Sequence, residues 1–129
     1  MKKKDIEHFR DLQAYQLAFA SAMKIYHISK SFPEEEKFSL VSQIRRSSRS
    51  VCSNLAEAWK KRKYMAVFKN KLTDSLQEAS ETQVWLEFSL ACDFIDKELF
   101  AELDAEYEVI MAKINTMHKK AHTFCFGET

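Results

Sequence analysis

The chain has 129 residues, 46% of them hydrophobic, and a formal net charge of +1. This length suits one domain with a single core and is too short for two ordinary domains. It contains one glycine and one proline, which excludes sheets, barrels and glycine-rich phosphate loops, because these need turn residues in number.

The charges are divided unevenly along the chain. Residues 1–63 contain 14 basic and 7 acidic residues, whereas residues 64–129 contain 6 basic and 12 acidic residues. Either the two halves attract each other, within the fold or between subunits, or part of the basic half faces a polyanion. The charge distribution alone does not decide between these two interpretations.

Cysteine content and hydropathy indicate the compartment. Cys52, Cys92 and Cys125 are an odd number of cysteines and lie far apart, which favours reduced thiols. No run approaches the roughly 18 uncharged apolar residues that a membrane-spanning helix needs. We therefore expect a cytoplasmic protein that has no membrane partner.

The first helix is predicted over residues 11–30. Its apolar side chains recur at helical spacing, at Leu12, Tyr15, Phe19, Ala22 and Tyr26. Asp11 is a suitable N-cap. The helix should end before Pro33, because the residue before a proline is biased out of the helical conformation.

The second helix is predicted over residues 34–60. Pro33 favours a helix start, and the three carboxylates of residues 34–36 complement the helix dipole. The apolar positions continue through Phe38, Val41, Ile44, Ser48, Cys52, Leu55 and Trp59. A turn is expected at residues 60–63, because the repeat changes phase there.

The third and fourth helices are predicted over residues 64–92 and 97–124. The repeat of the third consists of Met65, Phe68, Leu72, Ser75, Ala79, Thr82, Leu86 and Ser89. Ile95 and Phe100 are placed to form a hydrophobic staple around an Asp96 N-cap. The repeat of the fourth consists of Phe100, Leu103, Tyr107, Ile110, Ile114, Met117, Ala121 and Phe124.

Four long helices with short connections predict an all-α, up-down-up-down antiparallel four-helix bundle, with residues 1–129 as one domain. Further apolar residues lie beside the main stripes, at Leu40, Val51, Ala58, Trp85 and Phe88. Because a bundle needs one apolar stripe per helix, this surplus predicts a second burial surface in a closed cyclic oligomer.

The second helix carries an unusual set of polar residues. At helical spacing they form one stripe, Gln43, Arg46, Ser50, Asn54 and Glu57. We expect this stripe to be structural, with Arg46 crossing an interface to a carboxylate such as Glu57 or Glu81. The alternative is phosphate binding by neighbouring basic residues, for which the candidates are Arg45, Arg49, Lys60, Lys61, Arg62 and Lys63.

Four motifs occur in order along the chain. They are Phe9-Arg10-Asp11-Leu12, Phe32-Pro33-Glu34-Glu35-Glu36, Gln43-Ile44-Arg45-Arg46 and Ser53-Asn54-Leu55-Ala56-Glu57. Together they resemble the four-helix bundle family first met as proteins encoded in intervening sequences of large-subunit ribosomal RNA. The resemblance covers about residues 9–124 and implies an up-down bundle that assembles into a ring-shaped homopentamer.

The accessory variability proteins of diversity-generating retroelements are similar bundles. The resemblance to them implies basic pentamers that bind a reverse transcriptase and nucleic acid. With a net charge of +1, this chain is much less basic than those proteins.

Catalytic and metal-binding signals are sparse. The spacing of His118, His122 and Cys125 can bind zinc. Histidines near a helix C-terminus are more often exposed and favoured by the dipole. No Glu-x-x-His motif of a di-iron bundle occurs. We expect no catalysis, no bound metal and no cofactor.

Two functions from different classes remain. The first is a non-enzymatic, homo-oligomeric scaffold or adaptor that binds another protein. The alternative is an accessory protein that binds RNA or DNA through the basic residues of the second helix and of the turn after it.

Overall fold

The computed structural model describes residues 5–127, which form helices and connecting turns. The four long helices are α1 (Gln13–Ser29), α2 (Leu40–Lys60), α3 (Met65–Ala91) and α4 (Lys97–Lys119). Three short helices complete the chain: η1 (Phe9–Asp11), η2 (Glu34–Glu36) and α5 (Ala121–Phe124). None of the described helices is both long and apolar enough to cross a membrane.

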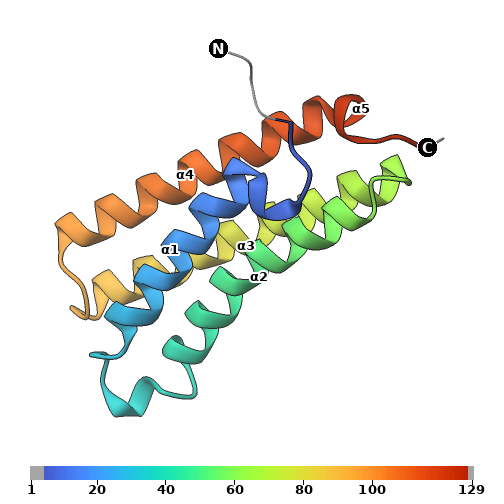
Figure 1. Cartoon of the computed structure of the whole chain (residues 1–129). Coiled ribbons are helices and arrows are strands. Elements are labelled where there is room, and N and C mark those ends of the chain that lie inside the picture. The colour runs from blue at the N-terminus through green and yellow to red at the C-terminus, as the bar shows by residue number, and fades with distance from the viewer. Residues whose placement is uncertain (1–4, 128–129) are drawn as a thin grey trace.

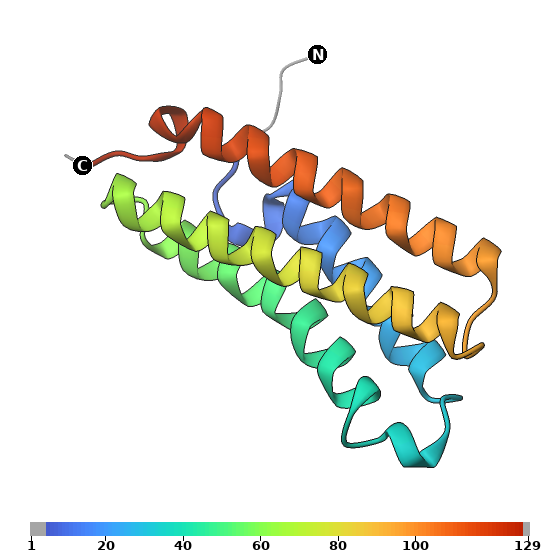
Figure 2. The ribbon, with the colours of Figure 1, turned by 180° about the vertical axis from the view of Figure 1, so that it is seen from behind.

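The four long helices lie side by side in an elongated bundle (Figures 1 and 2). Each packs on the next along the chain, and α1 also packs on α4. The connections are short, so consecutive helices run in opposite directions. The predicted all-α four-helix bundle is therefore confirmed.

The cores of α2, α3 and α4 follow the predicted repeats. Nearly all of their stripe residues are buried, with Phe68, Leu86 and Tyr107 among the fully buried side chains. Small hydroxyl residues allow α2 and α3 to approach closely. Two bonds between these helices lie inside the bundle: Ser75 donates to the Val51 carbonyl, and Thr82 donates to the Ser47 hydroxyl, both at 2.8 Å.

The predicted core face of α1 was wrong for its aromatic residues. Leu12 and Ala22 are buried as expected, but Phe19 is 51% exposed, and Tyr15 and Tyr26 are only partly buried. The buried residues of α1 are Ala14, Ala18, Ser21, Ala22, Ile25 and Ser29. These are mostly small side chains, so α1 can lie close to both α2 and α4 while its aromatic rings remain at the surface.

The predicted starts of the first two helices were also wrong. Leu12, and not Asp11, is the N-cap of α1; the Asp11 carboxylate accepts from the backbone N–H groups of Glu7 and His8. The second helix begins at Leu40 rather than at residue 34, since the three glutamates form the separate turn η2. Phe38 lies in this connection and is 88% exposed.

The remaining helix ends agree more closely with the sequence. The turn predicted at residues 60–63 separates α2 from α3, and Asp96 caps α4 by accepting from Leu99 N–H at 2.8 Å. The fourth helix is interrupted at Lys120, so its predicted last turn forms α5.

Candidate interaction surfaces on the outer side of α1 and α2

The polar stripe of α2 lies at the surface, where it contacts α3. The Arg46 guanidinium donates to Glu78 at 3.3 Å and to Glu81 at 2.5 Å, and its side chain is 49% exposed. Gln43 accepts from Arg46 at 3.4 Å, and the Asn54 amide donates to the Ser50 carbonyl at 2.9 Å. The Arg46 contacts connect α2 to α3 along one edge of the bundle, whereas the other two contacts lie within α2.

Two expectations about the stripe need correction. Glu57 does not pair with Arg46; it forms an ion pair with Lys71 of α3 at 2.8 Å. Arg46 is also not buried, so removing it does not strand a carboxylate inside the protein. An exposed ion pair of this kind contributes about 1 kcal/mol or less to the free energy of unfolding.

The six candidate nucleic-acid-binding residues do not form one surface. Arg45 and Arg49 lie beside Tyr26 of α1, with their guanidinium carbons 4.8 and 5.8 Å from the ring centroid. Arg49 and Lys60 are separated by about 16 Å along α2, from the 1.5 Å rise per residue. The candidates therefore divide into a pair near the start of α2 and a group at its end.

Arg45 has a structural role at the end of α1. Its Nε donates to the Ser29 hydroxyl at 2.9 Å, and its Nη2 donates to the Tyr26 carbonyl at 3.4 Å. Lys30 also lies over Tyr26, with its Nζ 4.7 Å from the ring centroid. Among the residues that the structure describes, no carboxylate forms an ion pair with these cations.

Arg62 is held within the turn between α2 and α3. Its Nε donates to the Trp59 carbonyl at 2.7 Å, and its guanidinium lies 3.5 Å from the Trp59 ring centroid and 5.3 Å from that of Phe126. Burial lowers the pKa of Arg62 from its ordinary value. Arg62 is thus part of the packing, whereas Lys60, Lys61 and Lys63 are exposed.

The C-terminal segment covers this turn. Phe126 N–H donates to the Arg62 carbonyl at 3.4 Å. A Cβ on Gly127 would lie 2.1 Å from the Lys63 carbonyl oxygen, so the close approach requires glycine at this position. Figures 1 and 2 both show the C-terminal segment beside the turn.

A basic groove runs along the outer face of α2. It is a hollow of about 630 Å³ lined by Lys37, Phe38, Val41, Ser42, Arg45, Arg46, Arg49, Ser50 and Ser53. Four of these side chains are cationic and none is a carboxylate. The sequence indicated part of this surface through its arginines, but it placed Phe38 in the core.

An aromatic groove lies next to it, between α1 and α2. This hollow of about 370 Å³ is lined by Phe9, Tyr15, Phe19, Ala22, Met23, Arg49, Cys52, Ser53 and Ala56. The ring centroids of Phe9 and Tyr15 are 5.0 Å apart, and those of Tyr15 and Phe19 are 6.0 Å apart. Sequence reasoning missed this groove because it assigned Tyr15 and Phe19 to the core.

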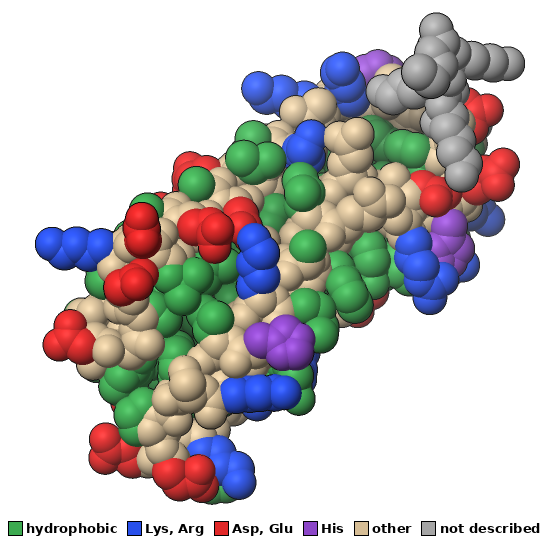
Figure 3. All heavy atoms as spheres, turned by 60° about the vertical axis from the view of Figure 1, so that its left-hand side comes forward, with side chains coloured by type: hydrophobic (Ala, Val, Ile, Leu, Met, Phe, Trp, Pro, Cys, Tyr) green, Lys and Arg blue, Asp and Glu red, His purple; other side chains and the backbone are tan. Residues whose placement is uncertain are grey.

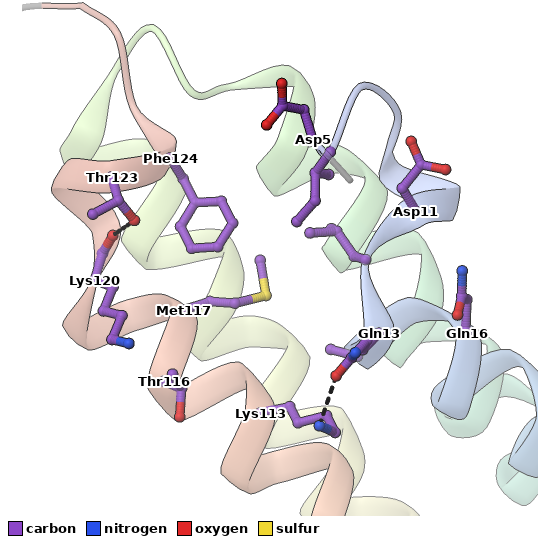
Figure 4. A pocket seen from close by; sticks show the side chains of 13 residues that line it. Asp5, Asp11, Gln13, Gln16, Lys113, Thr116, Met117, Lys120, Thr123 and Phe124 are labelled. Carbon is purple, nitrogen blue, oxygen red and sulfur yellow. Dashed lines mark hydrogen bonds between the residues drawn. The ribbon is translucent and has the colours of Figure 1, made fainter. Parts of the chain in front are cut away.

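A third hollow of about 770 Å³ opens where the N-terminal segment meets α4 and α5 (Figure 4). Met117 and Phe124 form part of its apolar wall. Lys113 donates to Gln13 at 2.9 Å across it, and the Thr116 and Thr123 hydroxyls donate to carbonyls of their own helices. These polar groups already have partners within the protein.

Comparison with known proteins identifies the family. The sequence profile of the 23S rRNA-intervening sequence proteins matches residues 10–116, which is most of the chain. The chain belongs to this family. The matched stretch includes the polar stripe, the basic groove and all of the aromatic groove except Phe9.

A solved structure supports the same assignment for this intervening-sequence protein. It is a crystal structure from Bacteroides thetaiotaomicron, described as a protein with unknown function from the S23 ribosomal protein family. The two share 29% sequence identity with a TM-score of 0.76, and the match covers 85% of this chain and 98% of the other. No curated protein gives a significant match.

Chemically reactive groups are scattered in this intervening-sequence protein. Burial raises the pKa of the Cys52 thiol to about 12, so the thiol remains protonated near neutral pH. The described residues contain no group of three histidine, cysteine, aspartate or glutamate side chains that could hold a metal ion. Of the hollows described above, two adjoin on α1 and α2, since both are lined by Arg49 and Ser53.

Proposed function

We propose that this intervening-sequence protein is a non-enzymatic, homo-oligomeric scaffold whose subunits associate through the aromatic groove. The observation that carries the proposal is the row of exposed apolar side chains on α1. Phe19 and Met23 are 51% and 41% exposed and lie beside Tyr15 and Phe9. Contiguous apolar surface of this kind marks protein–protein contact sites.

The surplus apolar surface expected from the sequence is exposed on α3 but not on α2. Leu40, Val51 and Ala58 are buried inside the bundle, so they are not available to another subunit. Phe88 is 54% exposed and lies 6.0 Å from Trp85, centroid to centroid. The apolar surface is thus supplied by α1 and by the end of α3, and Figure 3 shows green side chains exposed on one face.

The homopentamer implied by the family resemblance is the form of assembly that we propose. The aromatic groove involves α1 and α2, whereas Phe88 belongs to α3, so the apolar surfaces are not one patch. Contacts between different surfaces of identical subunits close into rings when the rotation permits. A ring would present identical surfaces in several copies to a partner protein.

Replacing Phe19 by glutamate should dissociate the assembly. A carboxylate placed in the aromatic groove would have to be desolvated at the subunit contact and would replace the apolar ring that forms it, which is unfavourable. We expect a wild-type mass that is a multiple of 15.1 kDa by light scattering, five-fold for the pentamer, and a mass of 15.1 kDa for Phe19→Glu.

Val67→Glu is the matched control for this experiment. Val67 is 39% exposed on α3 and lies outside the aromatic groove, so this variant should keep the wild-type mass. Circular dichroism checks that both variants remain helical. A wild-type mass of 15.1 kDa at micromolar concentration would refute the proposal.

The second candidate function is nucleic-acid binding at the turn between α2 and α3. It is favoured by three exposed lysines, Lys60, Lys61 and Lys63, next to Tyr64, which is 46% exposed. The Lys63 Nζ lies 5.7 Å from the Tyr64 ring centroid. Basic residues with an adjacent aromatic ring can contact phosphates and stack on a base.

Alanine at Lys60, Lys61 and Lys63 together should weaken binding of single-stranded RNA if this second function operates. With each phosphate contact, log affinity falls more steeply with log salt concentration, by about 0.7 in slope. Losing three contacts should therefore make the slope shallower by about 2. Mobility shifts at several salt concentrations measure it. Lys97→Ala, at the start of α4, is a control that should bind as wild type; equal salt slopes in all three proteins would rule this site out.

A further inference from the structure

Acidic and basic residues are separated along the long axis of the bundle. Residues 74–108, which form most of α3 and the first half of α4, contain eleven acidic residues and one lysine. Residues 58–73 and 109–127 together contain nine lysine and arginine residues and no acidic residue. Both of these stretches reach the end of the bundle where α2 turns into α3 and α4 passes into α5 (Figures 1 and 2). The net charge of +1 therefore hides one strongly basic end.

Carboxylates compensate only part of this charge. Lys71 is paired with Glu57 at 2.8 Å, and Asp5 and Asp11 lie in the hollow on the side of α4 (Figure 4). The next acidic residue along the chain, Glu128, lies outside the described residues. Five lysines at this end form no ion pair with another described residue, and together they define the basic end: Lys60, Lys61, Lys63, Lys69 and Lys119.

The C-terminal strap, Cys125–Gly127, lies against the basic end. Its backbone is joined to the turn between α2 and α3, since Phe126 N–H donates to the Arg62 carbonyl at 3.4 Å. Burial raises the pKa of the Cys125 thiol, whereas the nearby cations Arg62 and Lys69 act in the opposite direction. The strap is therefore close to cations of both the turn and α3.

Phe126 presents an aromatic ring to solvent beside these cations. It is 72% exposed, although phenylalanine is a large apolar residue. The Arg62 guanidinium carbon lies 5.3 Å from the centroid of the ring and is fixed by donation from Nε to the Trp59 carbonyl at 2.7 Å. Arg62 is thus a positioning residue that supports the ring from the protein side and leaves its outer side accessible.

A single-stranded nucleic acid matches both features of this surface. Its phosphates bind lysines, and its unpaired bases stack on exposed aromatic rings. An acidic protein segment would match the charge but would not need an accessible ring above a fixed guanidinium. The position of Phe126 therefore favours nucleic acid over an acidic protein.

We propose that the basic end binds single-stranded nucleic acid, with Phe126 stacking on a base and Lys69 contacting a phosphate. This inference rests on the second candidate function and extends its site from the turn to α3 and the C-terminal strap. The fold brings these parts together, because Phe126 lies far from the turn in the sequence.

Replacing Phe126 by alanine tests the stacking contact. Loss of one stacked base should weaken binding of a fluorescently labelled single-stranded RNA by roughly 5- to 150-fold. The salt slope should stay unchanged, because no phosphate contact is lost. Phe126→Tyr keeps the ring and should bind as the wild type does. Lys69→Ala should instead make the slope of log affinity against log salt concentration shallower by about 0.7. Fluorescence anisotropy at several salt concentrations measures both effects.

Two controls separate stacking from other effects. Inorganic polyphosphate carries the negative charge without bases, so Phe126→Ala should bind it as tightly as the wild type does. Phe38→Ala is the matched variant, since Phe38 is 88% exposed and lies 5.5 Å, centroid to Nζ, from Lys37. Phe38 is at the opposite end of the bundle, and its replacement should leave RNA binding unchanged (Figure 1).

The outcomes separate this inference from the second candidate function. If Phe126→Ala binds RNA as the wild type does, while alanine at Lys60, Lys61 and Lys63 weakens binding, the function stands and the stacking contact is wrong. An equal loss of polyphosphate binding in Phe126→Ala would mean that the strap only supports the fold, which also overturns the inference.

Three further results would overturn the proposal. Weaker RNA binding by Phe38→Ala, with Phe126→Ala unchanged, would place the nucleic acid at the basic groove of α2. Polyglutamate bound by the wild type as tightly as RNA would assign the basic end to an acidic protein. No RNA binding by the wild type at tens of micromolar protein would overturn both this inference and the second candidate function.

Discussion

Replacing Ile25 by alanine should lower the free energy of unfolding by about 2 to 5 kcal/mol, the range for truncating a buried isoleucine. Ile25 is 0% exposed and lies on the face of α1 that packs into the bundle. The substitution leaves a cavity among close-packed neighbours, which relax only partly. Urea unfolding at a fixed protein concentration measures the change.

Leu17→Ala on the same helix is the matched control for Ile25→Ala. Leucine and isoleucine are isomers, but Leu17 is 38% exposed and outside the core. We expect its truncation to cost about 1 kcal/mol or less, as for most surface substitutions. Equal losses in the two variants would mean that α1 does not pack through the face seen in the structure.

Replacing Tyr107 by phenylalanine should raise the free energy of unfolding by about 1 to 3 kcal/mol, the cost of burying a polar group without a partner. Tyr107 is 0% exposed, and its hydroxyl has no hydrogen-bond partner among the described residues. Burial raises the pKa of this hydroxyl, so it is neutral at all ordinary pH values. Phenylalanine keeps the ring and removes only the unpaired group.

Tyr64→Phe provides the comparison, because Tyr64 is 46% exposed and its hydroxyl can bind water. Its free energy of unfolding should match that of the wild type. A Tyr107→Phe protein less stable than the wild type would show that the hydroxyl has a partner in solution, such as a buried water molecule.

The buried faces of α2, α3 and α4 could be predicted from the sequence because burial in these helices follows side-chain type. In α3, large apolar residues such as Phe68 and Leu86 alternate with polar ones, so burial follows side-chain type. In α1, Tyr15, Phe19 and Tyr26 share one apolar stripe and Ala14, Ala18 and Ile25 form another beside it, so periodicity alone does not tell which of the two stripes is buried. The face with Ala14 and Ala18 is buried because small side chains let two neighbouring helices approach.

The candidate surfaces were predicted less well than the fold. The sequence predicted that Arg46 pairs with a carboxylate such as Glu57 or Glu81, but the choice between these two depends on how α2 and α3 pack, and the structure shows Glu81. Four consecutive basic residues predicted one charged run, yet Arg62 is stacked between Trp59 and Phe126. The last contact joins residues from distant parts of the sequence, which local patterns do not encode.

The buried hydroxyl contacts between α2 and α3 affect how the protein can move. If α3 slid along α2 by one turn, Ser75 and Thr82 would lose their partners Val51 and Ser47 inside the bundle. These two helices should therefore move as one rigid unit with a fixed register. Any rearrangement on assembly would have to occur elsewhere, and the irregular connection around Phe38, between α1 and α2, is the natural hinge.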